Sequence, residues 1–234
     1  MSSKNLKQIL NNVLGQSAFL QRDSFATGTD TDDLQMVAFA NRAVDEINDS
    51  YPWNKLRKSD SITMVGGQLS YDLPADFNYY ITESMWKSFG ARHVVIPTSN
   101  RYWGFLKAGN PGTGINYYAK LIQGKLEFVA VSAGDVINYD YQSSNAVISS
   151  TGVEKEEFTS DSDKYLLNDN TLALGIKAFW KIEKGIPTAQ VDMMEFKKMV
   201  KRDIAVDTPA VVIRDNSRWE GLPYAPPISS AYQW

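Results

Sequence analysis

The sequence predicts an α+β protein. Helices near its two ends form a bundle, an antiparallel β domain is inserted between them, and an extended C-terminal arm follows. Apolar residues recur at three- and four-residue steps near both ends, alternate with polar residues in the middle, and show no period after residue 206. Helices that are separated by a sheet pack most simply into one bundle from which the β part projects. The predicted parts are two helical ones at 1–56 and 151–206, the β domain at 57–150 and the arm at 207–234.

Two helices are predicted in the first part. The first is amphipathic and is expected to end at Gly15; its apolar residues are Leu6, Ile9, Leu10, Val13 and Leu14. The second begins within Thr29–Asp33, whose side chains can accept bonds from free N–H groups, and Pro52 stops it. Its apolar positions are Leu34, Val37, Ala40, Val44, Ile47 and Tyr51.

The middle of the chain reads as strands. A hairpin is predicted from Ile62 to Leu73, with Gly66-Gly67 as its turn. Irregular strands follow and include Tyr79–Ile81, Met85-Trp86 and Val94–Ile96. After a loop over Gly109–Gly114 we expect a second hairpin, 117–122 and 125–131 around Gln123-Gly124, and then a strand carrying Ile137, Tyr139 and Tyr141.

Helical spacing returns after a charged surface loop that contains Glu154, Glu156 and Glu157. Asn168–Thr171 offers caps to a helix that ends near Lys184-Gly185. Pro187-Thr188 opens the last helix. Its apolar face holds Met193, Phe196, Val200 and Ile204, and its other face holds Lys197, Lys198, Lys201 and Arg202.

The C-terminal arm combines prolines with large aromatic side chains that have no place in a periodic element. Burial of four aromatic side chains of the arm in a partner would remove roughly 150–250 Å² of surface each from water. The gross free energy gained is on the order of 20 kcal/mol in total. Fixing about 16 residues costs about 16–32 kcal/mol, so a single arm binds marginally, whereas several arms that act together bind tightly. The predicted partner-binding residues are Trp219, Pro223, Tyr224, Pro226, Pro227, Tyr232 and Trp234.

Composition excludes several classes of function. The absence of cysteine removes disulfides and thiolate zinc sites and fits a reducing compartment. A net charge of −3 argues against a protein that coats nucleic acid, because such binding depends on neutralising phosphates. We expect a soluble chain without a signal peptide, since no stretch approaches the roughly 20 apolar residues of a membrane span.

No motif in the sequence predicts catalysis, a metal or a cofactor. His93 is the only histidine, and Gly112-Thr-Gly114 and Gly124-Lys125 lack the context of phosphate-binding loops. Asp161 and Asp163 are expected to cap a helix start, with a divalent metal as the alternative. The cationic residues 197–202 are expected to be a solvated helix face, with DNA as the alternative. We therefore predict a non-enzymatic protein.

Three groups of motifs, taken in order, resemble the head-to-tail adaptor proteins of tailed bacteriophages, also called head-completion or tail tubular proteins. The first is Tyr51-Pro-Trp53 at the end of a capped helix. The second is Gly66–Phe77, followed by Tyr117-Tyr118 and Gly124–Phe128. The third is Phe158–Asp163, followed by Leu172–Ile176 and Trp180–Gly185.

The resemblance implies a ring-forming structural virion protein without catalytic residues, assembled in the host cytoplasm. Such a ring, typically twelvefold, lies beneath the portal protein of the capsid, contacts a tail nozzle or tail tube protein below, and lets DNA pass without holding it. The arm would reach into the portal. Glu154, Glu156 and Glu157 are candidates for the lumen because they lie in a charged loop, and an ordinary solvated loop is the alternative.

Two rival functions come from other classes. A carbohydrate- or ligand-binding β module would use Trp86, Tyr102 and Trp103 as exposed stacking platforms. A hydrolase would need Asp161 and Asp163 as an unrecognised carboxylate site.

Overall fold

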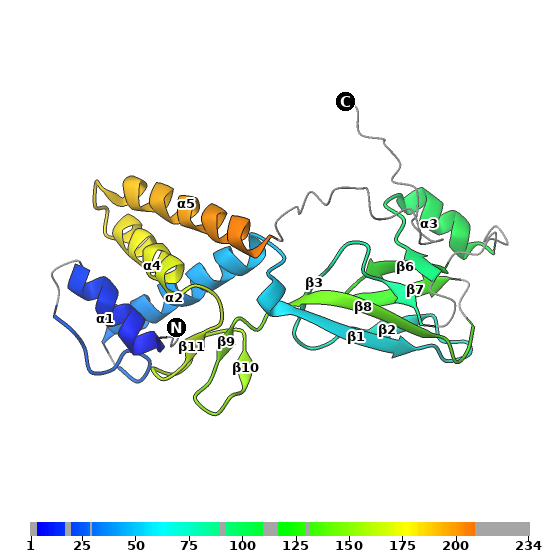
Figure 1. Ribbon diagram of the computed structural model, residues 1–234, viewed down its shortest axis with the longest axis horizontal. Coiled ribbons are helices and arrows are strands. Elements are labelled where there is room, and N and C mark those ends of the chain that lie inside the picture. The colour runs from blue at the N-terminus through cyan, green and yellow to red at the C-terminus, as the bar shows by residue number, and fades with distance from the viewer. Residues whose placement is uncertain are drawn as a thin grey trace, which may run out of the picture.

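The computed structural model describes residues 4–16, 20–28, 30–88, 92–109, 117–129 and 132–208 (Figure 1). These residues form an α+β structure with five α-helices and a large sheet. The helices are α1 (Leu6–Gln16), α2 (Thr31–Asp49), the 3-10 helix η1 (Asn54–Leu56), α3 (Asn100–Lys107), α4 (Asp169–Glu183) and α5 (Ala189–Asp207). The strands are β1 (Arg57–Thr63), β2 (Ser70–Asp72), β3 (Phe77–Tyr80), β4 (Trp86–Lys87), β5 (Arg92–Val95), β6 (Tyr117–Ile122), β7 (Lys125–Val129), β8 (Val136–Ser143), β9 (Val147–Ile148), β10 (Glu154–Lys155) and β11 (Lys164–Tyr165).

The first two helices confirm the predicted elements with changes at their ends. The side chains of Asn5 and Gln8 each accept the other's backbone N–H, at 2.9 and 3.0 Å, which caps α1 reciprocally. The helix includes Gly15, so the predicted stop there was wrong by one residue. Asp30 caps α2 by accepting from the backbone N–H of Asp32.

The buried face of α2 differs slightly from the predicted one. The helix ends at Asp49, so Tyr51 lies beyond it rather than on its face. Leu34 is half exposed, whereas Met36 is buried in its place. The remaining predicted positions pack against or inside the core.

The large sheet pairs its strands differently from the prediction. Its order is β1-β8-β4-β5-β6-β7-β2, with β3 paired to β8. The hairpin at β6 and β7 is confirmed, with Gln123 and Gly124 at positive φ in its turn. The hairpin predicted across Gly66-Gly67 is wrong, because β1 pairs with β8 and β2 pairs with β7. The sheet is also not wholly antiparallel, since β5 and β6 run parallel.

The sheet is strongly curled. Its two edge strands, β1 and β2, are six strand spacings apart, about 29 Å in a flat sheet. Residues 64–69 join them and span at most about 25 Å even when extended. They also contain a tight turn, in which the N–H of Gln68 donates to the carbonyl of Val65 at 3.1 Å. The edges therefore come close together, as Figure 1 shows.

Two hydrophobic clusters hold the described residues together. The first contains apolar residues of α1, α2, α4 and α5 together with Val147 of β9 and Tyr165 of β11; we call this region the helical part. The second lies within the curled sheet and includes Tyr71, Phe128 and Tyr139. Figure 1 shows α1, α2, α4 and α5 on one side of the molecule and the curled sheet, with α3 beside it, on the other. The domain boundaries themselves remain a prediction.

The three helices that follow β5 include one, α3, that we did not predict. Asn168 caps α4, and Gly185 follows its end at a φ of 65°, as expected. The predicted apolar face of α5 is confirmed, with Phe196 and Val200 buried. Helix α3, capped by Ser99, was missed. None of the described helices combines the length and apolar character needed to cross a membrane.

Candidate functional site

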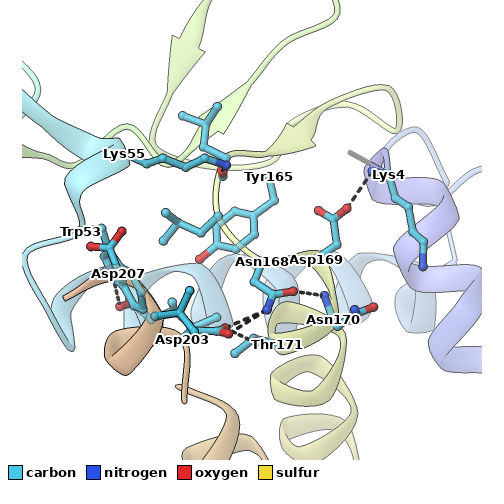
Figure 2. A pocket seen from close by; sticks show the side chains of 14 residues that line it. Lys4, Trp53, Lys55, Tyr165, Asn168, Asp169, Asn170, Thr171, Asp203 and Asp207 are labelled. Carbon is cyan, nitrogen blue, oxygen red and sulfur yellow. Dashed lines mark hydrogen bonds between the residues drawn. The ribbon is translucent and has the colours of Figure 1, made fainter. Parts of the chain in front are cut away.

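A cleft of about 970 Å³ opens where the two ends of the helical part meet the start of β1 (Figure 2). It is formed by the beginning of α4, the last turn of α5, and the segment Trp53–Lys55, with Lys4 at one side. We call it the root cleft, because the described chain ends at Thr208, the residue after α5 and next to Asp207 in the cleft wall. Any segment after residue 208 starts from this rim.

One wall of the root cleft is a hydrogen-bond network between α4 and α5. Figure 2 shows the side chains of Asn168 and Thr171 directed toward Asp203. The Asn168 amide donates to both carboxylate oxygens of Asp203, at 2.9 and 3.0 Å, and the Thr171 hydroxyl donates to one of them. The side-chain Oδ1 of Asn168 also accepts from the backbone N–H of Asn170 at 3.0 Å. The cap of α4 and the end of α5 are thus fixed to each other.

The other wall ties the end of α5 to the segment before β1. The Asp207 carboxylate accepts from the backbone N–H of Asn54 at 2.9 Å, and the Asp207 carbonyl accepts from the Asn54 amide at 2.8 Å. The hydroxyls of Tyr51 and Thr208 are 3.0 Å apart. These bonds hold the last described residue of the chain at a defined point.

The floor of the root cleft is apolar and its rim is charged. Tyr165 is almost fully buried; burial, with Asp203 and Asp169 as further causes, raises the pKa of its phenol far above the usual value, so the ring stays neutral. Lys55 donates to the carbonyl of Leu166 at 2.7 Å. Asp169 accepts from the backbone N–H of Lys4 at 2.8 Å. An apolar floor with a polar rim suits binding of a peptide segment.

The predicted arm residues lie outside the described part of the chain: Trp219, Pro223, Tyr224, Pro226, Pro227, Tyr232 and Trp234. Their role remains a prediction. Of the three candidate lumen residues, Glu154 pairs with Lys58 at 2.6 Å, while Glu156 and Glu157 are exposed.

The two aspartates considered for a metal have structural roles. Asp161 accepts from the Ser24 hydroxyl at 2.6 Å and from the backbone N–H groups of Phe25 and Ala26. Burial alone would raise the pKa of Asp161, but these hydrogen bonds outweigh it and hold the pKa below its usual value. Asp163 is buried and accepts from two backbone N–H groups and from Lys155 at 2.6 Å. Asp161 thus holds the segment before α2, and Asp163 holds the loop that precedes α4, rather than capping a helix start. No group of three candidate metal ligands occurs among the described residues.

Only two of the three stacking platforms of the rival β module are exposed. Trp103 is buried under α3, which corrects the expectation that it is exposed. Trp86 on β4 and Tyr102 on α3 are each more than 40% exposed, but Tyr102 stacks on Phe105 rather than on Trp86. His93 lies exposed on β5 opposite Trp86, with no imidazole partner in the chain.

The root cleft was not predicted as a site. Asn168–Thr171 were predicted only as a helix cap, and no role was predicted for Asp203. Their pairing joins positions about 35 residues apart, and no local pattern signals it. The proximity of Trp53 to the end of α5 is likewise a tertiary feature.

A family model described as SU10 adaptor protein matches residues 5–172, more than two thirds of the chain. The match covers α1, α2, the whole curled sheet and the start of α4. No curated protein matches the chain.

Proposed function

We propose, for a chain that belongs to the SU10 adaptor protein family of phage head-tail adaptors, that it assembles as a ring which joins the portal of the capsid to the tail. The family match is the observation that carries the proposal, because it supports a structural head-tail adaptor role and a place in the virion. The ring would be made of identical copies, twelve in the expected case. Its helices, which share one hydrophobic cluster, would act as the bundle in this assembly.

The proposed partners lie above and below the ring. The portal protein would receive the C-terminal arm, and a tail nozzle or tail tube protein would bind the opposite side. The bonds around Asp207 and Thr208 support this role, because they give the arm a fixed starting point. A fixed origin lowers the entropy lost when the arm docks.

DNA would pass through the ring without being held. The net charge of −3 supports this, since an acidic protein has little affinity for phosphates that must slide past. In this proposal the protein performs no catalysis, and its work is to join two larger assemblies after it has been made in the host cytoplasm.

Deleting residues 215–234 tests the role of the arm. We expect the shortened protein to keep its fold and to lose binding to the portal protein encoded in the same phage genome. A full-length variant with Trp219, Tyr224, Tyr232 and Trp234 replaced by alanine separates the contribution of the rings from that of chain length. Circular dichroism monitors the fold and a pull-down monitors binding; unchanged portal binding by both variants would refute the role of the arm.

A further inference from the structure

Helix α5 presents a cationic surface that is not neutralised within the described residues. Lys197, Lys198, Lys201 and Arg202 are all exposed, and none of them takes part in an ion pair there. We call these four residues the basic face. Two pairs of like charge stand four residues apart within it, which destabilises an isolated helix. Such a cost in the free subunit points to a partner that relieves it.

The basic face continues into an apolar stripe. Val191 and Met194 are 67% and 72% exposed, and they stand at helical spacing from Lys198 and Lys201 on the outer side of α5. Phe196 and Val200 occupy the inner side, against α4 and α2. The outer side of α5 therefore combines exposed apolar area with positive charge.

A surface of opposite charge lies elsewhere on the helical part. Asp45 and Asp49 of α2 and Glu156 and Glu157 after β10 are exposed and form no ion pair within the described residues; we call them the acidic face. Partial burial raises the pKa of Asp45, and the charges of Asp49, Glu157 and Glu156 raise it further, so these three carboxylates lie near Asp45. Asp49 accepts one hydrogen bond, from the Asn78 amide at 3.0 Å.

The two faces lie on different elements of the helical part, the basic face on α5 and the acidic face on α2 and the segment after β10. In Figure 1, α5 lies along the top of the helical part and β10 lies at its bottom, with α4 and α2 between them. Helix α4 packs on both α5 and α2, and the carbonyl of Phe158, next to Glu157, accepts from Asn41 of α2 at 3.3 Å. No ion pair joins the two faces within the described residues of one copy, whereas a second copy could supply the opposite charges.

We propose that the basic face of one copy docks on the acidic face of the next and that this contact closes the ring. Different patches on the two partners make a head-to-tail contact, which repeats until the rotation closes on itself. The proposal rests on the proposed ring function and names the surface that builds it. Charge complementarity also sets the register between copies and speeds their association at low salt.

Cross-linking tests the contact directly, because the natural chain contains no cysteine. A variant with both Glu157→Cys and Lys198→Cys is treated with a flexible bis-maleimide under two conditions. In the first, the variant is alone at high concentration in low salt; in the second, it has been mixed with portal protein. We expect a ladder of linked multimers from the double variant and no ladder from either single variant. No ladder in either condition, or linked dimers from a single variant, would overturn the proposal.

Charge reversal supplies a second test. Lys198→Glu with Lys201→Glu should abolish ring assembly, and adding Asp45→Lys and Glu157→Lys should restore it. Arg101→Glu with Lys164→Glu is the matched control, because it changes the net charge equally at exposed residues outside both faces. Ring assembly that survives Lys198→Glu with Lys201→Glu would contradict the contact, even if the variant still binds the portal protein. A natural chain that does not bind the portal protein would instead count against the proposed function alone.

DNA is the other ligand that a basic helix face can attract. Fluorescence anisotropy with a short DNA duplex distinguishes the two. We expect no measurable binding by the natural chain at physiological salt. Binding that is lost on Lys198→Glu with Lys201→Glu, while the ladder persists, would assign the basic face to DNA and overturn the proposal.

Discussion

At the scale of single residues, Gly175 shows how closely the helices approach one another. A Cβ atom at this position would lie 2.9 Å from Cε2 of Phe196 and 3.1 Å from Cβ of Ala43. These contacts come from α5 and α2, so one missing methyl group lets both helices pack against α4. Phe196 is itself buried and has little room to move.

We expect Gly175→Ala to lower the free energy of unfolding by about 1–3 kcal/mol, because the added carbon overpacks the core. Gly15→Ala is the matched control: it also lies in a helix, with no atom within 4 Å of the added carbon. The control should leave stability unchanged or raise it by up to about 1 kcal/mol. Urea unfolding measures both, and equal stabilities would show that the helices do not approach as described.

Asp192 links α5 to α4 through Lys181 at 2.5 Å and Lys177 at 3.1 Å. Burial alone would raise its pKa, but the two lysines outweigh it and hold the pKa below the usual value of 3.8. A carboxylate with a depressed pKa stabilises the fold above that value, and the stabilisation is lost as the pH falls through the folded-state pKa.

Asp192→Asn should therefore lower the free energy of unfolding by about 2 kcal/mol at pH 7. The difference from the natural chain should shrink below about pH 4, as Asp192 becomes protonated in the natural chain. Chemical denaturation across this range measures it. A difference that stays constant with pH would show that the ion pairs do not stabilise the fold.

At the level of helices and strands, local signals predicted helix caps and turns well, whereas the pairing of the strands was predicted poorly. Asp30 and Asn168 cap the helices that their sequence context indicated, because a cap depends on residues two or three positions away. The turn at Gly66-Gly67 was also recognised, yet β1 pairs with β8 and β2 pairs with β7, because these partners lie far along the chain, where no local pattern indicates them. Helix α3 was missed because it is short and contains Gly104.

The root cleft is a second case in which distance along the chain limited prediction. Its walls join Asn168 to Asp203 and Asn54 to Asp207, and no periodicity connects such positions. A sequence pattern gives the cap at Asn168 but not the carboxylate that fixes it. The site therefore became visible only when the elements were assembled.

We expect Asp207→Ala to loosen the end of α5 from Asn54, because it removes the carboxylate that accepts the Asn54 N–H. The loss of stability should be about 1 kcal/mol, and the Asn54 amide should exchange hydrogen faster. Glu195→Ala, which removes an exposed carboxylate from the same helix, is the control. Hydrogen exchange that is unchanged at Asn54 would contradict the anchoring role of Asp207.

At the scale of the whole molecule, the helical part brings together three features that an adaptor needs. One hydrophobic cluster joins helices from both ends of the described chain, the bonds in the root cleft hold Thr208 at the end of α5, and two groups of opposite charge lie on different elements. The curled sheet has a hydrophobic cluster of its own and projects from the helical part. Such a body has separate surfaces for the proposed contacts with like copies and with unlike partners.

Native mass spectrometry, with and without the portal protein of the same phage, is the sharpest test of the proposed portal-bound ring. We expect the portal protein to capture many copies of the 26.2 kDa chain in one closed complex of fixed stoichiometry. A chain whose mass stays the same when the portal protein is added would contradict it.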